Sequence, residues 1–356
     1  MILLNPGPVN VSARVTAALA RGDLCHREPE CEELLARIRA RLLAAFAPAG
    51  GFAAVLLTGS GTAALEMAVT SVLSERGRLV VVANGVYGER IAAMAATARL
   101  PHTVVESDWL SPPALAAVER ALRVPDVEAV AVVHHETTTG LLNAVAQVGR
   151  LARTRGKLLL VDSVSGIGGD GLDLEEVGAD LVVGTAGKCI QAFPGMAFVL
   201  VRETALSRLA THPRRSLYLS LPLHYEAQIR GSVPFTPAVQ LAYALDEALA
   251  ELLEEGVAAR IARYGAAATL LRAGFARLGL TCPLPSDLRS NSITALGLPA
   301  GHTYASLHDA LKARGFVVYE GQGRLAQDIF RVANMGHLTE ADFVSFLDAL
   351  AAVLGA

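Results

Sequence analysis

Two stretches, Lys157-Leu-Leu-Leu-Val-Asp162-Ser163 and Asp180-Leu-Val-Val-Gly-Thr-Ala-Gly-Lys188, decide the fold of this chain. Each contains a continuous run of apolar residues that ends in polar ones, which is typical of a strand buried on both faces of a parallel sheet. In such sheets the ligand lies beyond the carboxyl ends of the strands. We therefore expect Asp162 and, 26 positions later, Lys188 to reach one edge of the same sheet.

Similar apolar runs lie on either side of these stretches and alternate with segments of helical periodicity. The alternation predicts an α/β fold whose mostly parallel sheet is covered by helices on both faces. The strand candidates are Ala54–Leu57, Leu79–Ala83, Ala129–His134, Leu158–Asp162, Leu181–Gly184 and Met196–Val201, and the helix candidates include Ala63–Leu73, Tyr87–Ala98, Pro113–Leu122 and Gln147–Thr154.

A change of pattern near Tyr218–Pro237 indicates a second domain. The stretch from Ala238 to about Leu278 that follows has apolar residues at helical spacing and is expected to bridge two domains. We place a large domain at residues 1–240, and the linking helix with a small C-terminal α+β domain at residues 241–356. Strands of the small domain are expected at Ser292–Leu296, Val317–Tyr319 and Ile329–Val332.

The composition excludes several classes of protein. The chain has 356 residues, 52% hydrophobic and 18% charged, as expected for a compact globular protein. Its net charge of −3 gives no electrostatic reason to expect that it binds nucleic acid. No apolar run approaches the roughly 20 residues that cross a bilayer, and Met1–Pro8 lacks the features of a signal peptide. The absence of these features indicates a cytoplasmic location. The four cysteines have no metal-binding spacing, and we expect them to be reduced thiols.

Asp162 and Lys188 together suggest a specific chemistry. An enzyme that uses pyridoxal phosphate needs a lysine that forms a Schiff base with the cofactor aldehyde, and a carboxylate that keeps the pyridine nitrogen protonated. The alternative is a structural or helix-capping Asp162 and a solvated Lys188. The position of Lys188 directly after an apolar strand favours burial, which in turn favours the neutral amine that this chemistry requires.

The segment Thr58-Gly-Ser60-Gly61-Thr62 places a turn between a predicted strand and a predicted helix. Backbone N–H groups at a helix N-terminus, with hydroxyl groups beside them, form a phosphate site. An ordinary Ser/Thr N-cap explains the same residues equally well. The segment has neither the lysine of a P-loop nor the glycine spacing of a dinucleotide-binding turn.

Three other segments carry candidate binding residues. In Asn84-Gly-Val-Tyr87-Gly-Glu-Arg90, the tyrosine would either stack on a planar cofactor or pack at a domain seam. His134-His135-Glu136-Thr137-Thr138-Thr139-Gly140 suggests a metal, but adjacent residues of an extended chain point to opposite faces, so we expect no metal and a polar loop that bonds a bound ring. Arg331, alone in an apolar strand, requires either a structural carboxylate or the carboxylate of a substrate.

Taken in order, these segments resemble the class V aminotransferases of fold type I, and within them the 2-aminoethylphosphonate transaminase family. Leu-Leu-Asn-Pro-Gly-Pro8 and Cys25-His-Arg-Glu-Pro-Glu30 belong to the same resemblance, which covers nearly the whole chain. It implies a mostly parallel seven-stranded sheet between helices, pyridoxal 5'-phosphate as the cofactor, and a homodimer with shared active sites.

The resemblance also implies residue roles. Lys188 would bond to the cofactor and move a proton between substrate and cofactor, and Asp162 would pair with the pyridine nitrogen. Arg331 would grip the carboxylate of pyruvate or alanine, and Arg27 is a candidate contact for an anionic donor. The other cofactor-binding residues would be Ser60, Gly61 and Thr62 at the phosphate, Tyr87 stacked on the ring, Thr138 near the ring hydroxyl, and Thr236 at the phosphate of the neighbouring subunit.

The activity implied is ping-pong transfer of the amino group of 2-aminoethylphosphonate to pyruvate, giving phosphonoacetaldehyde and alanine. The alternatives are an aminotransferase of the alanine–glyoxylate or serine–pyruvate type and, on the same fold, a lyase or desulfurase. Two departures from the family bear on this expectation. Gly187 stands where relatives place an Asn or Gln that contacts the phosphate, so we expect modestly weaker cofactor retention, and Glu320-Gly-Gln322 replaces Pro-Gly-Lys near the substrate.

Overall fold

The computed structural model describes residues 1–355, and a seven-stranded sheet lies at its centre. The order of the strands is β2-β10-β9-β8-β5-β3-β4. Strand β10 runs antiparallel to both of its neighbours, and the other pairs are parallel. The predicted mostly parallel sheet of seven strands is therefore confirmed. The strands are β2 (Phe52–Thr58), β3 (Arg78–Ala83), β4 (His102–Glu106), β5 (Val127–Val133), β8 (Leu158–Asp162), β9 (Leu181–Thr185) and β10 (Met196–Arg202).

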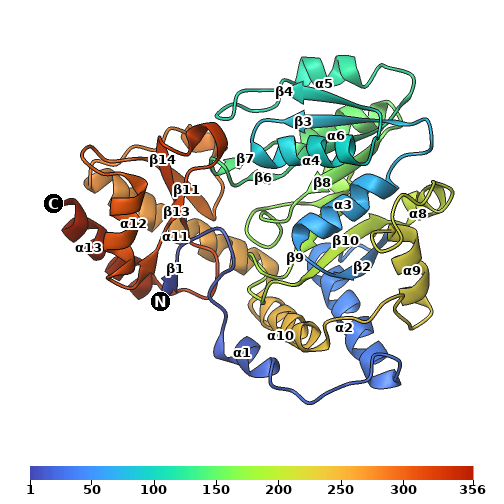
Figure 1. The fold of residues 1–356 in the computed structure, drawn as a ribbon, viewed down its shortest axis with the longest axis horizontal. Coiled ribbons are helices and arrows are strands. Elements are labelled where there is room, and N and C mark those ends of the chain that lie inside the picture. Colours follow the sequence, from blue (N-terminus) through green and yellow to red (C-terminus); the bar gives the residue numbers. More distant parts are fainter. Residues whose placement is uncertain (356) are drawn as a thin grey trace.

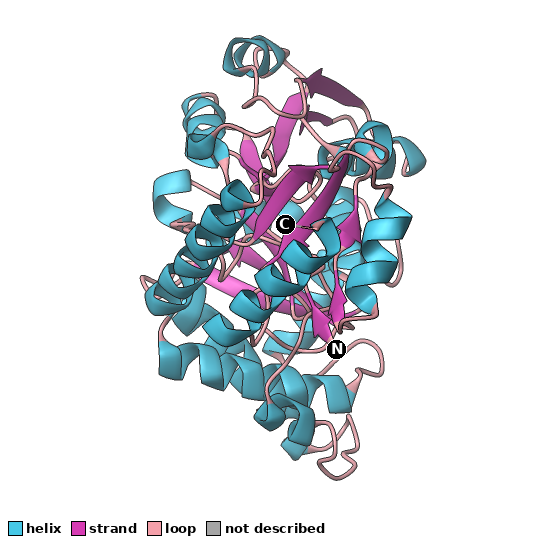
Figure 2. Ribbon diagram, turned by 90° about the vertical axis from the view of Figure 1, so that its left-hand side faces the viewer, coloured by secondary structure: helices cyan, strands magenta, loops and turns pink. Residues whose placement is uncertain are grey.

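Helices cover both faces of this sheet (Figure 1, Figure 2). Alternate residues of a strand point to opposite faces, so Val55 and Leu57 of β2 join one apolar core, and Ala54 and Leu56 join the other. The first core includes α3 (Gly61–Ser71), α4 (Val86–Thr97), α8 (Glu203–Leu209) and α9 (Leu221–Ile229). The second includes α1 (Ala13–Ala18), α2 (Pro29–Phe46), α5 (Leu115–Ala121), α6 (Val145–Thr154), α7 (Leu174–Val177) and α10 (Val239–Glu255).

A break at Gly256 divides the long helical stretch that the sequence predicts. Helix α10 ends at Glu255, and α11 (Val257–Arg277) begins directly after the glycine. The φ angle of Gly256 is 86°, in the left-handed region that glycine adopts at little cost. The chain therefore changes direction between α10, which packs on the large sheet, and α11, which packs on the small domain.

The small domain contains a second, three-stranded antiparallel sheet of order β11-β14-β13. Its strands are β11 (Ile293–Gly297), β13 (Tyr319–Glu320) and β14 (Ile329–Ala333), and α12 (Tyr304–Lys312) and α13 (Glu340–Leu354) complete its core. Within residues 1–355, no helix has the length and apolar character to cross a membrane.

The N-terminal segment is attached to the small domain. Strand β1 (Ile2–Leu3) pairs in parallel with β12 (Phe316–Val317), and Leu4 is buried in the core of the small domain. The boundary near residue 240 stays a prediction. The structure adds that the first strand lies with the C-terminal part of the chain, as the N and C labels of Figure 1 also show.

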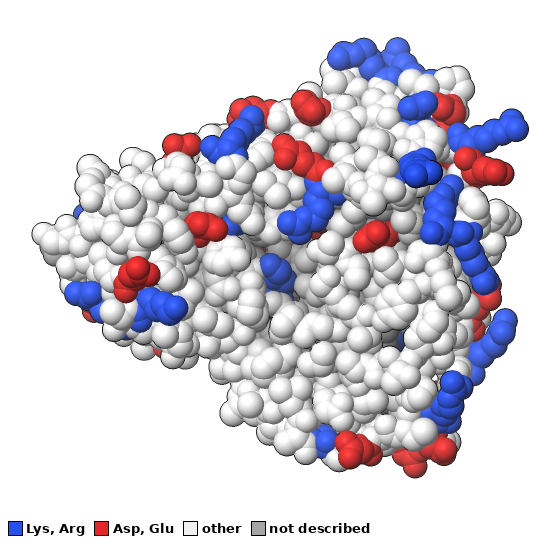
Figure 3. Space-filling model, viewed as in Figure 1, with Lys and Arg blue, Asp and Glu red and all other residues white. Residues whose placement is uncertain are grey.

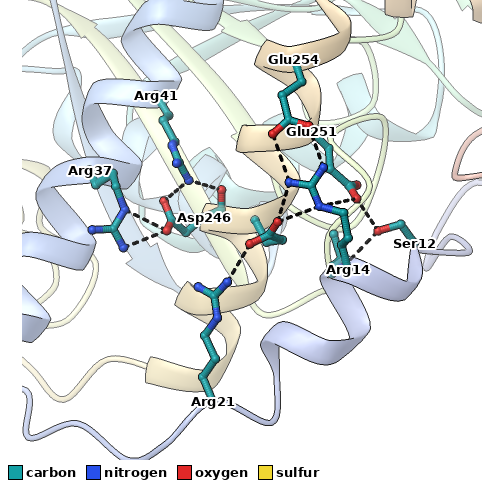
Figure 4. Close-up of polar contacts among 10 residues, drawn as sticks. Ser12, Arg14, Arg21, Arg37, Arg41, Asp246, Glu251 and Glu254 are labelled. Atoms are coloured by element: carbon teal, nitrogen blue, oxygen red, sulfur yellow. Dashed lines mark hydrogen bonds and ion pairs between the residues drawn. The ribbon is translucent and has the colours of Figure 1, made fainter.

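Charged contacts tie the N-terminal helices to α10 (Figure 4). Asp246 of α10 is buried, and its carboxylate accepts hydrogen bonds from Arg37 at 2.9 Å and Arg41 at 2.5 Å, both on α2. Farther along α10, Glu254 pairs with Arg14 of α1 at 2.6 Å, on the surface. The Asp246 carboxylate is buried whereas the Glu254 carboxylate is exposed, so we expect the contacts of Asp246 to contribute more to the stability of the large domain.

Candidate active site

Lys188 and Asp162 lie at the carboxyl ends of neighbouring parallel strands. Asp162 is the last residue of β8, and Lys188 follows β9 after a short turn. Burial lowers the pKa of Lys188 to about 8, and the positive charges of Arg331 and Arg90 act in the same direction. The amine is therefore far closer to its neutral form at physiological pH than an ordinary lysine.

Asp162 is a buried carboxylate that is only partly satisfied. Burial raises its pKa to about 6, so the group is still ionised at neutral pH. Its Oδ1 accepts the backbone N–H of Val164 at 3.0 Å, and among residues 1–355 no donor bonds to Oδ2. That oxygen is free for a protonated ring nitrogen.

The N-terminal segment lies directly against Lys188. The Nζ atom donates a hydrogen bond to the carbonyl oxygen of Pro6. A Cβ atom at Gly7 would lie 2.8 Å from Cδ of Lys188, and the φ angle of Gly7 is 108°, so only glycine fits this close approach. Pro6 and Gly7 of the N-terminal segment are therefore in direct contact with the side chain of Lys188.

The turn Ser60-Gly61-Thr62 opens α3 next to Asp162. Ser60 is the N-cap, and its hydroxyl accepts the N–H of Ala63 at 3.2 Å, so the capping alternative is realised. The first N–H groups of a helix have no acceptor within the helix, and the helix N-terminus favours an anion. A Cβ at Gly61 would lie 2.8 Å from Val164, two residues after Asp162, so the turn and the carboxylate are brought together.

The loop after β5 packs against the start of α4. It contains the short hairpin β6 (His135–Glu136) and β7 (Leu141–Leu142). The hydroxyl of Thr138 already donates its proton to Glu136 at 2.6 Å and accepts the N–H of Val86 at 3.1 Å, which leaves it one acceptor position. The neighbouring Thr137 hydroxyl is buried and has no hydrogen-bond partner among residues 1–355. Of the two threonines, Thr137 is therefore the one whose hydroxyl group can donate its proton to a ligand.

Arg331 is completely buried in β14 and is oriented by both domains. Its Nε donates to the carbonyl oxygen of Glu320 at 2.8 Å, and its Nη1 donates to that of Thr137 at 2.8 Å and to the side chain of Gln322 at 3.1 Å. Its Nη2 has no partner within residues 1–355. A buried, unpaired N–H group of this kind is costly, and an anionic ligand would satisfy it.

Two predicted site residues stand apart from Lys188 within the single chain. Thr236 is exposed in the loop before α10 and lines a small cavity with Thr58 and Tyr218. Arg27 is exposed in the turn that precedes α2, and it forms no ion pair among residues 1–355. Neither has a described contact with Lys188.

The histidine pair has structural contacts. His134 Nδ1 lies 3.0 Å from the Ser163 hydroxyl, and His135 Nδ1 lies 3.3 Å from the carbonyl oxygen of Ser165. Burial lowers the pKa of His134 to about 4 and that of His135 to about 3, so both are neutral. In the part of the chain that the structure describes, no three His, Cys, Asp or Glu side chains form a metal-binding group.

Several residues beside the site make contacts that the sequence analysis did not predict. The Cζ atom of Arg90 lies 4.6 Å from the centre of the Tyr87 ring, a contact that their spacing of three on a helix could have indicated. The segments that contain Glu136 and Gln322 were noted in the sequence, but their contacts with Tyr87 and Arg331 come from tertiary packing and could not be predicted from it. A Cβ at Gly187 would lie 3.1 Å from Pro194, so a larger residue there requires a small shift.

The residues present fit pyridoxal phosphate. The site offers a near-neutral lysine, a carboxylate with one free oxygen, an anion-binding helix N-terminus, a free buried hydroxyl at Thr137 and a free guanidinium nitrogen at Arg331. Figure 3 shows that this face is hollowed between the two domains, with basic side chains in the hollow. Fold and site together define the fold type I class of pyridoxal-phosphate enzymes.

The chain belongs to the class V aminotransferase family, whose sequence model matches residues 12–343. It is 38% identical, over 96% of its length and 93% of the relative, to the 2-aminoethylphosphonate–pyruvate transaminase of Syntrophobacter fumaroxidans. The enzyme of that name from Vibrio vulnificus is 36% identical over 98% of this chain and 96% of its own. An aspartate aminotransferase from Thermus thermophilus superposes with a TM-score of 0.91 at 29% identity, covering 100% of this chain and 99% of that structure.

Proposed function

We propose that the chain is a transaminase that moves the amino group of 2-aminoethylphosphonate to pyruvate, giving phosphonoacetaldehyde and alanine, with pyridoxal 5'-phosphate as its cofactor. The observation that carries the proposal is the buried Arg331, which has one unpaired nitrogen and whose charge acts on Lys188. The names of the two curated relatives support the choice of donor and acceptor.

One anion site serves both substrates in this proposal. Pyruvate carries its charge on a carboxylate, whereas 2-aminoethylphosphonate has no carboxylate and carries its charge on phosphorus. An arginine fork binds either group. Glu320, Gln322 and Thr137 hold the rest of the Arg331 guanidinium, so its Nη2 is the group that we assign to the substrate anion.

Lys188 and Asp162 handle the protons. When bound, pyridoxal phosphate supplies an electrophilic carbonyl and an electron-accepting ring. We assign to Nζ of Lys188 the proton that leaves the amine-bearing carbon of the donor and the proton that reaches Cα of alanine, since its pKa of about 8 permits both directions near neutral pH. The pKa of Asp162, about 6, keeps this group ionised, so that it holds a proton on the ring nitrogen.

The remaining residues bind and orient. We assign the phosphate to Ser60, Gly61 and Thr62, the ring face to Tyr87, and a ring substituent to the Thr137–Thr138 pair. Thr236 lies apart from Lys188 in its own chain and is exposed, so we assign it to the phosphate of the neighbouring subunit in a homodimer. We place the enzyme in the cytoplasm. Arg27 is assigned to the donor side of the site.

The visible spectrum of the purified protein tests the proposal. Addition of 2-aminoethylphosphonate without acceptor should remove the absorbance of the bound cofactor and release phosphonoacetaldehyde, and pyruvate should restore the absorbance. A protein that ignores this amine but responds to serine or alanine would move the donor to the alternative. A protein that cannot be loaded with pyridoxal phosphate would overturn the proposal.

A further inference from the structure

We propose that Glu136 is a positioning residue that fixes, through a single loop, both the aromatic ring of Tyr87 and the guanidinium of Arg331. The inference rests on the proposed function, which gives those two side chains to the cofactor and to the substrate. Glu136 itself is completely buried and is assigned no direct contact with either ligand.

The carboxylate of Glu136 holds the first turn of α4. It accepts the backbone N–H of Tyr87 at 3.2 Å, the N–H of Gly88 at 3.2 Å and the hydroxyl of Thr138 at 2.6 Å. Thr138 in turn accepts the N–H of Val86 at 3.1 Å. The first three N–H groups of the helix are therefore satisfied by two residues of another loop.

Helix α4 depends on this outside cap, because it has none of its own. Its N-cap residue is Gly85, which has no side chain to accept a hydrogen bond. A Cβ at Gly85 would overlap the side chain of Glu136, so the glycine also makes room for the carboxylate. Burial raises the pKa of Glu136 to about 7, while its hydrogen bonds from Thr138, Tyr87 and Gly88 favour the ionised form. The ionised carboxylate is stabilising at a helix N-terminus, and unpaired N–H groups there are costly when buried. Tyr87 lies in that first turn, so the position of its backbone depends on the hydrogen bond to Glu136.

The same loop also accepts hydrogen bonds from the small domain. The carbonyl oxygen of Thr137, between Glu136 and Thr138, accepts Nη1 of Arg331 at 2.8 Å. Farther along, the carbonyl oxygen of Gly140 accepts the N–H of Ser290 at 2.9 Å. The loop thus spans both domains, and a displacement of Glu136 would reach the ring face and the anion site together.

Glu136→Gln tests the inference, with Glu128→Gln as the matched control. Glu128 also accepts a backbone N–H and a hydroxyl, both from Ser74, and it has no described contact with Tyr87 or Arg331. We expect Glu136→Gln to raise the dissociation constant of pyridoxal phosphate and the KM for pyruvate about tenfold each, the scale of one charge-assisted hydrogen bond. Glu128→Gln should change neither constant.

A double-mutant cycle separates positioning from general stability. In a Tyr87→Ala background, Glu136→Gln should no longer weaken cofactor binding, because the effect passes through the ring. Emission from Trp109, the single tryptophan, checks the fold, since this side chain is buried beside Gly323 of the small domain. A folded Glu136→Gln protein that matches Glu128→Gln in both constants would overturn the inference.

Two further outcomes are also decisive. If Glu136→Gln does not fold, Glu136→Asp, whose shorter side chain withdraws the carboxylate from Tyr87 and Gly88, must weaken cofactor binding in the same direction, and normal binding by that variant would overturn the inference. Cofactor binding is measured without substrate, so a wild-type protein that binds pyridoxal phosphate but ignores 2-aminoethylphosphonate fails only the proposed function. A wild-type protein that binds no cofactor overturns both.

Discussion

At the scale of single residues, the ionisation of Lys188 sets a pH dependence. Its pKa of about 8 lies below the ordinary lysine value of 10.5. The neutral amine is the reactive form, so uptake of pyridoxal phosphate by cofactor-free protein should rise with pH, with a midpoint near 8. Stopped-flow absorbance between pH 6.5 and 10 measures it. Because the charge of Arg90 lowers this pKa, Arg90→Gln should move the midpoint upward, and a rate that does not change with pH would contradict the assignment.

Arg331→Lys should damage substrate binding more than its conserved charge suggests. A lysine cannot make the three-way contact with Glu320, Thr137 and Gln322 and also present a second nitrogen to an anion. We expect the KM for pyruvate to rise about 10- to 100-fold, as for the loss of a charge-assisted pair. Gln322→Ala, which removes one support, should give a smaller rise. Equal KM values in Arg331→Lys and the parent would exclude Arg331 from the anion site.

At the scale of helices, the buried carboxylate of Asp246 joins α2 to α10 (Figure 4). Asp246→Asn should lower the free energy of unfolding by about 2–3 kcal/mol, the range for a hydrogen-bonded buried charge. Glu254→Gln is the matched control, because its pair with Arg14 is exposed on both sides. Denaturant unfolding should show a loss only for Asp246→Asn, with KM unchanged. Equal losses would contradict the difference in burial.

The strands and helices of the large domain could be predicted well because their patterns are local. Leu158–Asp162 is confirmed at both ends as β8, and the other predicted elements lie within two residues of their observed bounds. Strand β4 was missed since His102-Thr-Val-Val-Glu106 lies at the edge of the sheet and has few apolar residues. The break at Gly256 was also missed, because a single glycine in a helical pattern does not reveal a left-handed φ.

The candidate active site could be predicted only in part from the sequence, because many of its contacts are not local. Asp162 and Lys188 could be proposed because one ends a strand and the other closely follows one, and the carboxyl ends of parallel strands share an edge. The contact between Arg331 and Thr137 joins residues 194 positions apart, and no local pattern encodes it. The same holds for the choice between Thr137 and Thr138, whose hydroxyl groups differ only in what packs around them.

At the scale of the whole molecule, the exposed position of Thr236 predicts a dimer with sites shared between subunits. Leu217 and Ile229, in the same part of the chain, are 74% and 61% exposed, which is consistent with an apolar contact surface. Lys188→Ala and Thr236→Glu should each be inactive, the second because a carboxylate would repel the phosphate. Mixed and refolded together, they should recover up to about a quarter of wild-type activity, since half the dimers would have one intact site. No recovery, with mixed dimers demonstrated, would place Thr236 in its own subunit's site, and an active Thr236→Glu protein would place it in neither site.

The pairing of β1 with β12 has a consequence for synthesis of the chain. Ile2 leaves the ribosome long before its partner Phe316, which follows more than 300 residues later. Until then the segment that borders Lys188 lacks its pairing with β12, because contacts so distant in sequence form late. The large sheet can fold co-translationally, but its lysine is enclosed only after nearly the entire chain is made. A ribosome-bound fragment that lacks the C-terminal domain is therefore expected to fold without acquiring activity.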